Sequence, residues 1–263
     1  MNKEKERLGE IRKNIDCLGG YNMKIIEYNG RHDVWIEFQD EYKAKVHTGY
    51  GNFKKGKVKN PYHPNIYGVG YLGQGKYKAT ENNKNTKAYT YWHDMLKRCY
   101  DPWFLNKEPT YIECYVCDEW LCFQNFAEWF YKNYYEIEGQ KMQLDKDILY
   151  KGNKIYSPNT CIIAPQRINQ LIVNKQKHRG KYPIGVYDWL NRTNGDKLLL
   201  VRCSTLERLE ILGYFPLNKP FQAFTCYKNF KENYIKQVAD EYKDLIPKEL
   251  YEALYKYEVE INN

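Results

Sequence analysis

The most informative segment of this chain reads Leu144-Asp145-Lys146-Asp147-Ile148-Leu149-Tyr150-Lys151-Gly152-Asn153-Lys154-Ile155-Tyr156-Ser157-Pro158-Asn159-Thr160-Cys161. An apolar residue followed by an acid indicates the start of a short strand, and Gly152-Asn153 indicates a turn. Ser157-Pro158-Asn159-Thr160 is typical of a helix start, because such side chains cap helices and proline fits their first turn. We therefore predict a strand, a turn and a helix over residues 144–172.

Outside this segment, residues 1–76 read as a β-rich module. Apolar and polar residues suggest strands at Met23–Tyr28 and Val34–Phe38, joined by a polar turn, and a short helix is expected at Lys5–Asn14. Residues 77–87 lack apolar periodicity, so they are predicted to be a polar linker.

The rest of the chain reads as two further modules, residues 88–174 and 182–263. In the first, apolar residues recur every three or four positions, which predicts helices at Tyr89–Cys99 and Phe123–Tyr134. In the second, strands are expected near residues 185–190, 197–203 and 206–215, followed by a long helix over 219–242 and a short one in 248–261. The chain is therefore predicted to be an α+β protein, with a three-stranded sheet plus helix at its C-terminal end.

Basic charge is concentrated in the first third of the chain. The formal net charge is +8, and residues 1–80 hold 15 Lys and Arg against 9 Asp and Glu. A second basic cluster comprises Lys146, Lys151, Lys154, Arg167, Lys175, Lys177 and Arg179. This distribution favours a polyanion such as DNA or RNA as the partner.

No apolar run follows Met1–Glu6, and no stretch reaches the roughly 20 apolar residues of a membrane span. We therefore expect a cytoplasmic protein with no membrane partner, whose eight cysteines are thiols or metal ligands. Cys114-x-x-Cys117 is half of a zinc site, which a Cys from elsewhere in the fold (Cys99, Cys122 or Cys161) could help to complete. The alternative is that these cysteines are buried core thiols.

Three short motifs between residues 89 and 161 carry a resemblance to a known family. They are Tyr89…Trp92…Met95…Arg98-Cys99-Tyr100, then Val116-Cys117-Asp118-Glu119-Trp120…Phe123…Phe126, and Leu144-Asp145…Gly152-Asn153…Tyr156-Ser157-Pro158…Cys161. In this order they resemble phage-type His-Asn-His homing endonucleases. The resemblance implies a ββα-metal module in a phage or mobile-element protein.

The same resemblance implies site residues. Asp145, Lys146, Asn153 and Asn159 would stand at catalytic positions, and Asp145, Asp147 and Asn153 could hold Mg²⁺ or another divalent ion through oxygen ligands. The chain departs from the family pattern at Lys146, which stands where a histidine base is usual. Both an active nuclease and a retained scaffold therefore stay open.

The third module carries a second resemblance, through Gly185-Val186, Leu212-Gly213-x-Phe215 and Ala223-Phe224…Tyr227-Lys228. It resembles the DNA-binding domain of plant ethylene-response factors, in which a three-stranded sheet lies in the major groove. The expected DNA contacts are Tyr187, Trp189, Arg192, Lys197, Arg202 and Arg208, with Lys151 and Lys154 from the central segment. An ordinary solvated strand face is the alternative.

These observations predict a metal-dependent endonuclease that binds double-stranded DNA. The alternative is a catalytically inactive DNA-binding regulator or phage counter-defence factor on the same scaffold, and RNA binding is a third option. Since the third module reads as self-contained, deletion of residues 180–263 is expected to leave the centre folded.

Overall fold

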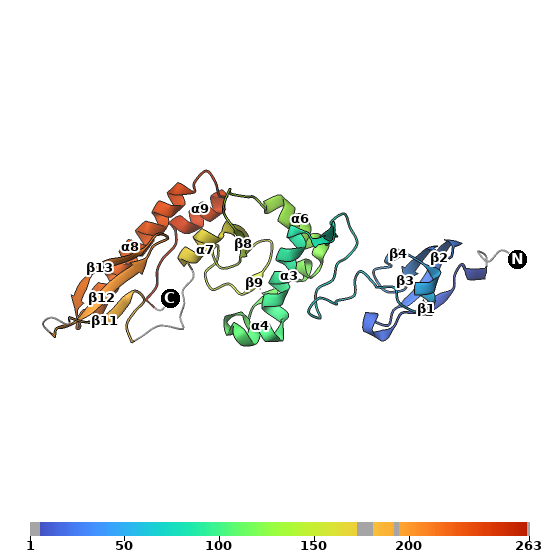
Figure 1. Ribbon diagram of the computed structural model, residues 1–263, viewed down its shortest axis with the longest axis horizontal. Coiled ribbons are helices and arrows are strands. Elements are labelled where there is room, and N and C mark those ends of the chain that lie inside the picture. The colour runs from blue at the N-terminus through green and yellow to red at the C-terminus, as the bar shows by residue number, and fades with distance from the viewer. Residues whose placement is uncertain (1–5, 173–180, 192–194, 262–263) are drawn as a thin grey trace. The chain divides into compact units, whose positions relative to one another are not determined.

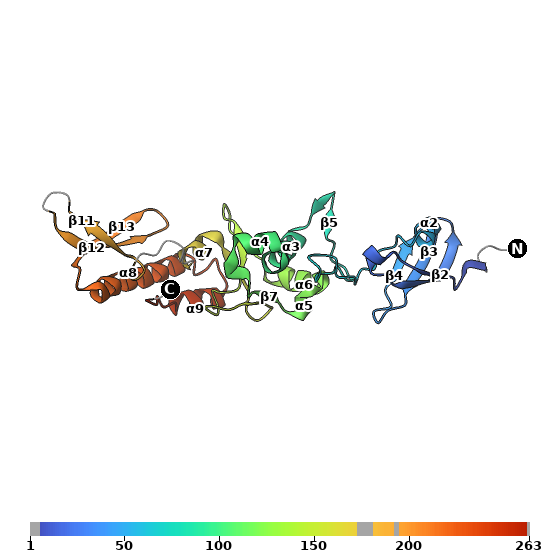
Figure 2. The same cartoon turned by 90° about the horizontal axis from the view of Figure 1, so that it is seen from below.

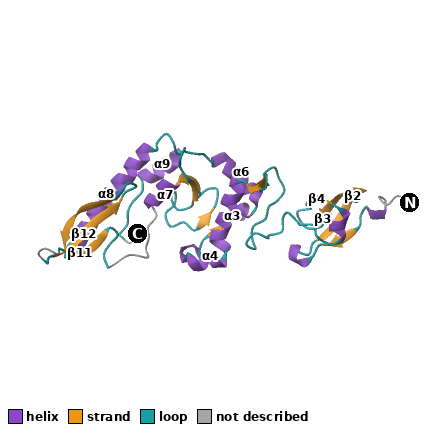
Figure 3. Ribbon diagram, viewed as in Figure 1, coloured by secondary structure: helices purple, strands orange, loops and turns teal. Residues whose placement is uncertain are grey.

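The computed structural model describes residues 6–172, 181–191 and 195–261. Helices and several small sheets alternate along the chain, which confirms the predicted α+β class (Figures 1 and 3). The chain forms two compact units: residues 1–132 with 154–158, and residues 133–153 with 159–263.

The first unit begins with a four-stranded antiparallel sheet, in the order β1-β2-β3-β4 (Figure 2). Its strands are β1 (Ile11–Lys13), β2 (Asn22–Gly30), β3 (Asp33–Phe38) and β4 (Lys45–Thr48), with the 3-10 turn η1 (Asp16–Leu18) between β1 and β2. One face of β2 and β3 is fully buried together with Phe53 of the short helix α2 (Tyr50–Lys54). The helix expected at Lys5–Asn14 is confirmed only at Glu6 and Arg7 and is wrong beyond them, because Ile11–Lys13 pairs with Asn22–Lys24 as a strand.

The predicted linker at residues 77–87 instead contains a tight hairpin, β5 (Thr80–Glu81) paired with β6 (Lys84–Asn85). Asn82 and Asn83 both have positive φ, 49° and 59°, the backbone that a two-residue hairpin turn requires and asparagine tolerates. Thr86 follows directly and caps the next helix by accepting a hydrogen bond from the Tyr89 amide.

Helices dominate the rest of the first unit. They are α3 (Lys87–Tyr100), α4 (Pro102–Lys107), the 3-10 turn η2 (Pro109–Tyr111), α5 (Asp118–Leu121) and α6 (Phe123–Asn133). The predicted helices α3 and α6 are confirmed, and each buries one apolar face. The Trp92 indole donates a hydrogen bond to the Trp120 carbonyl at 2.7 Å, which ties α3 to α5. The short strands β7 (Tyr115–Val116) and β9 (Ile155–Tyr156) pair in parallel.

The second unit contains the strand predicted at Leu144-Asp145, as β8 (Met142–Asp145). The helix start predicted at Ser157–Thr160 is wrong: that segment forms a turn, and a second strand, β10 (Ile162–Pro165), pairs with β8 in antiparallel fashion. Every residue of β10 is buried, so this apolar run is a core strand. The helix α7 (Gln166–Ile172) starts only after it.

The C-terminal sheet is confirmed as three antiparallel strands in the order β11-β12-β13. They are β11 (Val186–Leu190), β12 (Lys197–Ser204) and β13 (Leu209–Pro216), followed by α8 (Pro220–Glu241) and α9 (Lys248–Tyr255). The first half of α8 packs on the sheet through Ala223, Phe224 and Tyr227. Its second half packs with α9 against β10 and α7 in another cluster (Figure 1).

The two units therefore divide the chain within the predicted module 88–174, at residue 133. The β8, β10 and α7 elements share their core with the C-terminal helices of the same unit. No helix in the described ranges has both the length and the apolar character that crossing a bilayer requires.

Candidate functional site

Asp145 ends β8 and organises the backbone that follows. Its Oδ1 accepts hydrogen bonds from the amides of Asp147 at 2.7 Å and Ile148 at 2.8 Å, so the carboxylate closes a turn on its own chain. Burial raises the pKa of Asp145 above its ordinary value, although these two bonds and Lys146 act in the opposite direction.

Lys146 is buried, with 6% of its surface exposed. Its Nζ donates to the Asn153 carbonyl at 2.7 Å and forms an ion pair with Asp147 Oδ2, also at 2.7 Å. In return, Asn153 Nδ2 donates to the Lys146 carbonyl at 2.9 Å. These two hydrogen bonds join Lys146 and Asn153 across the loop, and Asn153 holds the backbone of Lys146 in place.

This geometry gives Lys146 a structural task. An ammonium group carries donors only, so it cannot accept a proton unless it first loses one. The resemblance implies a general base at this position, but the Lys146 Nζ already donates to two oxygens. The residue predicted as catalytic therefore holds the loop closed.

Two of the predicted ligands of a divalent ion are engaged by groups of the loop itself. Asp147 Oδ2 contacts the Lys146 ammonium, and Asp145 Oδ1 is taken by two backbone donors. Among the residues that the structure describes, no group of three or more His, Cys, Asp or Glu side chains could hold a metal.

The side chains of the other central candidates take no part in the contacts between Lys146, Asp147 and Asn153. Asn159 is exposed in the turn before β10. Lys151 forms an ion pair with Glu260 at 3.0 Å, and Lys154 forms one with Glu113 at 3.5 Å. One polar contact escaped the sequence reasoning: Asn169 on α7 donates to Gln143 on β8 at 2.9 Å and fastens the helix to the strand. The sequence does not mark this contact, because Asn169 is one of four polar residues in α7.

The motif residues Arg98, Tyr100 and Tyr156 meet in the first unit. The Arg98 guanidinium donates to the buried Tyr156 hydroxyl. The Tyr100 hydroxyl accepts from the Val116 amide at 3.0 Å, and the Cys117 amide donates to the Tyr156 carbonyl at 2.9 Å. These motif positions therefore fasten α3 and β7 to β9, which is a structural role.

The Cys114-x-x-Cys117 pair is not part of a zinc cluster among the described residues. Cys114 is buried, and its thiol lies 3.8 Å from the Thr110 carbonyl. Burial raises the pKa of the Cys117 thiol, which disfavours the thiolate that a zinc ion binds. This environment suits the alternative of structural thiols.

The second candidate site is the face of the C-terminal sheet opposite α8. Val186, Leu199 and Val201 point to the helix side and are buried. Since side chains alternate along a strand, the other face carries Tyr187, Trp189, Leu198, Leu200, Arg202 and Tyr214. We call these six residues the open sheet face.

Aromatic rings and one arginine are ordered on the open sheet face. The Arg202 guanidinium carbon lies 4.2 Å from the centre of the Tyr187 ring, and the Trp189 and Tyr214 rings are 4.6 Å apart. Tyr187 and Tyr214 are 39% and 46% exposed. A cation above an aromatic ring is attracted to it while its edge donors stay available.

The remaining predicted DNA contacts lie outside this face or are engaged locally. Lys197 is exposed at the start of β12, opposite Leu190. Arg208 forms an ion pair with Glu210 at 2.6 Å. Arg192 lies outside the described residues.

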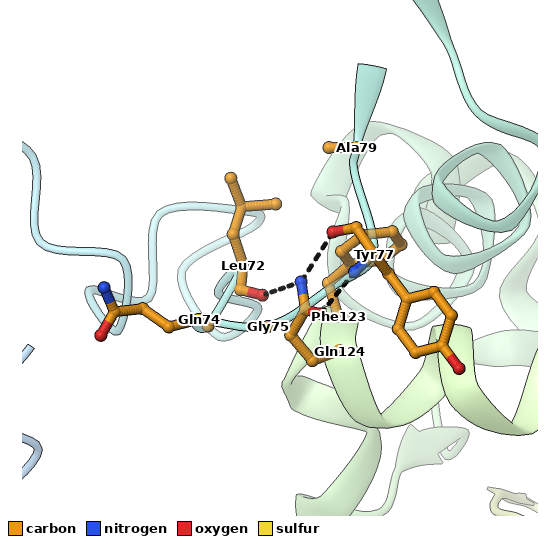
Figure 4. Close-up of a pocket in the computed structure, with 8 residues that line it drawn as sticks. Leu72, Gln74, Gly75, Tyr77, Ala79, Phe123 and Gln124 are labelled. Atoms are coloured by element: carbon orange, nitrogen blue, oxygen red, sulfur yellow. Dashed lines mark hydrogen bonds between the residues drawn. The ribbon is translucent and has the colours of Figure 1, made fainter. Parts of the chain in front are cut away.

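A glycine-rich loop in the first unit lines a cavity of about 280 Å³ (Figure 4). Gln124 closes it by donating to the Tyr77 carbonyl and accepting from the Tyr77 amide, at 2.9 and 3.0 Å. A Cβ on Gly73 or Gly75 would collide with Cys122 or Gln124, so close packing accounts for these glycines. The lining also includes Phe123 and Gln124, the first two residues of α6.

Comparison of the chain with protein-family models, with curated proteins and with solved structures gave no match.

Proposed function

We propose that this protein binds duplex DNA through the open sheet face. The observation that carries the proposal is the placement of Arg202 over Tyr187 on an uncovered sheet that α8 supports from behind. A guanidinium held in this way can present paired donors to a guanine edge or to a phosphate. The net charge of +8 favours the same partner.

The open sheet face is preorganised for such contact. The buried residues of β12 anchor it to α8, and tyrosine and tryptophan lose little conformational entropy on binding. Trp189 and Tyr214 give the sheet a flat aromatic area beside the arginine, which suits contact with sugars and with thymine methyl groups.

In this proposal the β8–β10–α7 element serves as a scaffold that does not cut. The support is the Lys146 ammonium, which lies against Asp147 where a nuclease would place a metal and a base. The protein would then act as a DNA-binding regulator or counter-defence factor.

Binding is tested with duplexes selected from a randomised pool by the full-length chain. Arg202→Ala is expected to lose about 1–3 kcal/mol of discrimination against shuffled duplexes if it reads a base, or to weaken all duplexes alike if it touches phosphate. Arg167→Ala is the control, because it removes the same charge from α7, where Arg167 forms an ion pair with Glu207. Affinity unchanged by the Arg202 substitution, or stronger binding to RNA, would refute the sheet as the DNA site.

A metal-dependent DNA endonuclease is the second candidate. Two observations favour it. The chain runs strand, loop, strand and helix over β8, β10 and α7, and the Asn153 side chain donates a hydrogen bond to the carbonyl of Lys146, which stands where the resemblance implies the base. Plasmid incubated with Mg²⁺ or Mn²⁺, with and without chelator, separates the two candidates. Nicking that the chelator and Asp145→Ala both abolish would establish the enzyme, and binding without nicking favours the regulator.

A further inference from the structure

The first unit carries a run of lysines without acids. From Tyr42 to Thr80 the sequence contains Lys43, Lys45, Lys54, Lys55, Lys57, Lys59, Lys76 and Lys78 and no Asp or Glu. Four of them, Lys54, Lys55, Lys57 and Lys59, lie at the end of α2 and just after it. We call these four residues the basic ridge.

Packing directs all four ridge side chains outward. Phe53, Gly56, Val58 and Asn60 are buried, and the lysines between them are exposed. Gly56 has a φ of +66°, and a Cβ there would lie 2.9 Å from the Lys13 carbonyl, so the chain turns tightly against β1. The Asn14 side chain donates to the Val58 carbonyl at 3.2 Å. The ridge is therefore held on an ordered backbone.

The ridge ammonium groups form no ion pair with any residue in the described ranges. Other lysines differ: Lys132 pairs with Glu128 at 2.9 Å, and Lys228 pairs with Glu232 at 3.3 Å. Lys13, whose backbone touches Gly56, adds a further positive charge near the ridge, although Asp16 lies 3.8 Å from it. Positive charge is thus left uncompensated locally.

We propose that the basic ridge binds the phosphate backbone of duplex DNA, as a second contact besides the open sheet face. This inference rests on the proposed DNA binding. Lysines act as point charges toward phosphate and carry little sequence information. An exposed apolar residue, Ile15, lies beside the ridge and donates its amide to the Gly56 carbonyl, so the test includes a lipid surface as the competing partner.

The test compares the salt dependence of duplex binding by three full-length proteins. They are the wild type, the ridge variant K54Q/K55Q/K57Q/K59Q, and the control variant K132Q/K228Q/K248Q/K256Q. Both variants lose four charges, but each control lysine forms an ion pair, with Glu128, Glu232 or Glu252. Each phosphate contact contributes about 0.9 to the slope of log affinity against log salt, so the ridge variant should lose about 3 to 4 from the slope.

A control variant with nearly the wild-type slope and a ridge variant with the shallower slope would support the proposal. Equal slopes for the ridge variant and wild type, with wild-type binding intact, would overturn the ridge and leave the sheet proposal standing. Absence of DNA binding by the wild type would overturn both. Wild-type binding to phosphatidylserine vesicles that only the ridge variant loses, with unchanged DNA slopes, would overturn the ridge as a DNA contact and assign it to membranes.

Discussion

Lys146 places an ammonium group inside the loop that follows β8, where burial is costly unless acceptors surround the charge. Asp147 and the Asn153 carbonyl supply those acceptors at 2.7 Å each. The ammonium group of Lys146 therefore lies against Asp147, one of the acids that was predicted to bind a metal ion. These contacts support the proposal that the centre is a scaffold.

Lys146→Met keeps the apolar stem and removes the charge. The Asn153 carbonyl and the Asp147 carboxylate then lose their donor, and the second unit should be destabilised by about 1–3 kcal/mol. Hydrogen exchange of β8 and β10 amides in urea measures the change. Lys248→Met is the control, because Lys248 is exposed and pairs only with Glu252 on its own helix. Equal protection of these amides in both variants would show that the Lys146 charge does not stabilise the second unit.

Asp145→Asn tests the buried carboxylate, because the amide oxygen still accepts from the Asp147 and Ile148 backbones. Burial raises the folded-state pKa of Asp145, so the native chain holds this proton more tightly than the unfolded chain does. Wild-type stability therefore falls as pH rises from the ordinary Asp pKa through the folded value, and stays lower above it.

The Asn variant lacks this penalty. It should match the wild type at a pH below the ordinary Asp pKa and exceed it in stability at neutral pH. Urea midpoints of the second unit at several pH values provide the measurement. A stability difference that does not change with pH would show that ionisation of Asp145 does not oppose folding.

Among the secondary-structure elements, those with long apolar periodicity were predictable. The helices α3, α6 and α8 and the sheet β11-β12-β13 lie close to their expected residues, since each buries a face that its sequence pattern marks. Short elements were missed for physical reasons. The hairpin at Asn82-Asn83 depends on two positive φ angles, and β10 reads as a strand only once β8 pairs with it.

The candidate sites were predictable only in part. Residues Asp145, Lys146, Asp147 and Asn153 meet in one loop, as their spacing suggested. The contacts themselves were not predictable, because the Lys146 acceptor is a backbone carbonyl seven residues away. The stacking of Arg202 on Tyr187 likewise depends on strand register, which places Tyr187 opposite Leu200.

Gly185→Ala tests the packing of the C-terminal sheet on α8. Gly185 has a φ of +80°, and an added Cβ would meet the Tyr227 ring at about 2 Å. Left-handed backbone costs about 1–2 kcal/mol, and overpacking adds about 1–3 kcal/mol. Gly152→Ala is the matched control, with a φ of +75° and open space around its Cβ. Chemical denaturation should show a clearly larger loss for Gly185→Ala, and equal losses would mean that Tyr227 moves aside freely.

Across the whole molecule, α8 serves two cores. Its first half covers the C-terminal sheet, and its second half joins α9, α7 and β10. Of the twelve buried residues in the second cluster, seven come from α8, α9 and the turn between them. The β8–β10–α7 element and the C-terminal sheet are therefore built on one helix, and are not independent modules.

A chain ending at residue 180 should consequently lose the β8–β10–α7 element, contrary to the expectation that the centre folds alone. Burying one large apolar side chain contributes about 1.5–3 kcal/mol, and the truncation removes Ile235, Val238, Tyr242, Ile246, Leu250 and Leu254 from its core. That loss is comparable to the about 5–15 kcal/mol that stabilises a typical domain. Helices α3 and α6 should stay folded, because their buried residues Trp92, Phe126 and Phe130 are retained.

Hydrogen exchange read residue by residue checks this outcome. Amides of β8, β10 and α7 should exchange freely in the truncated chain, while those of α3 and α6 keep their protection. Addition of the separate 181–263 fragment is the control, since it restores the missing helices and should restore protection to β8 and β10. Full protection of β8 and β10 without the fragment would show that the ββα element is stable alone, and that α8 only covers it.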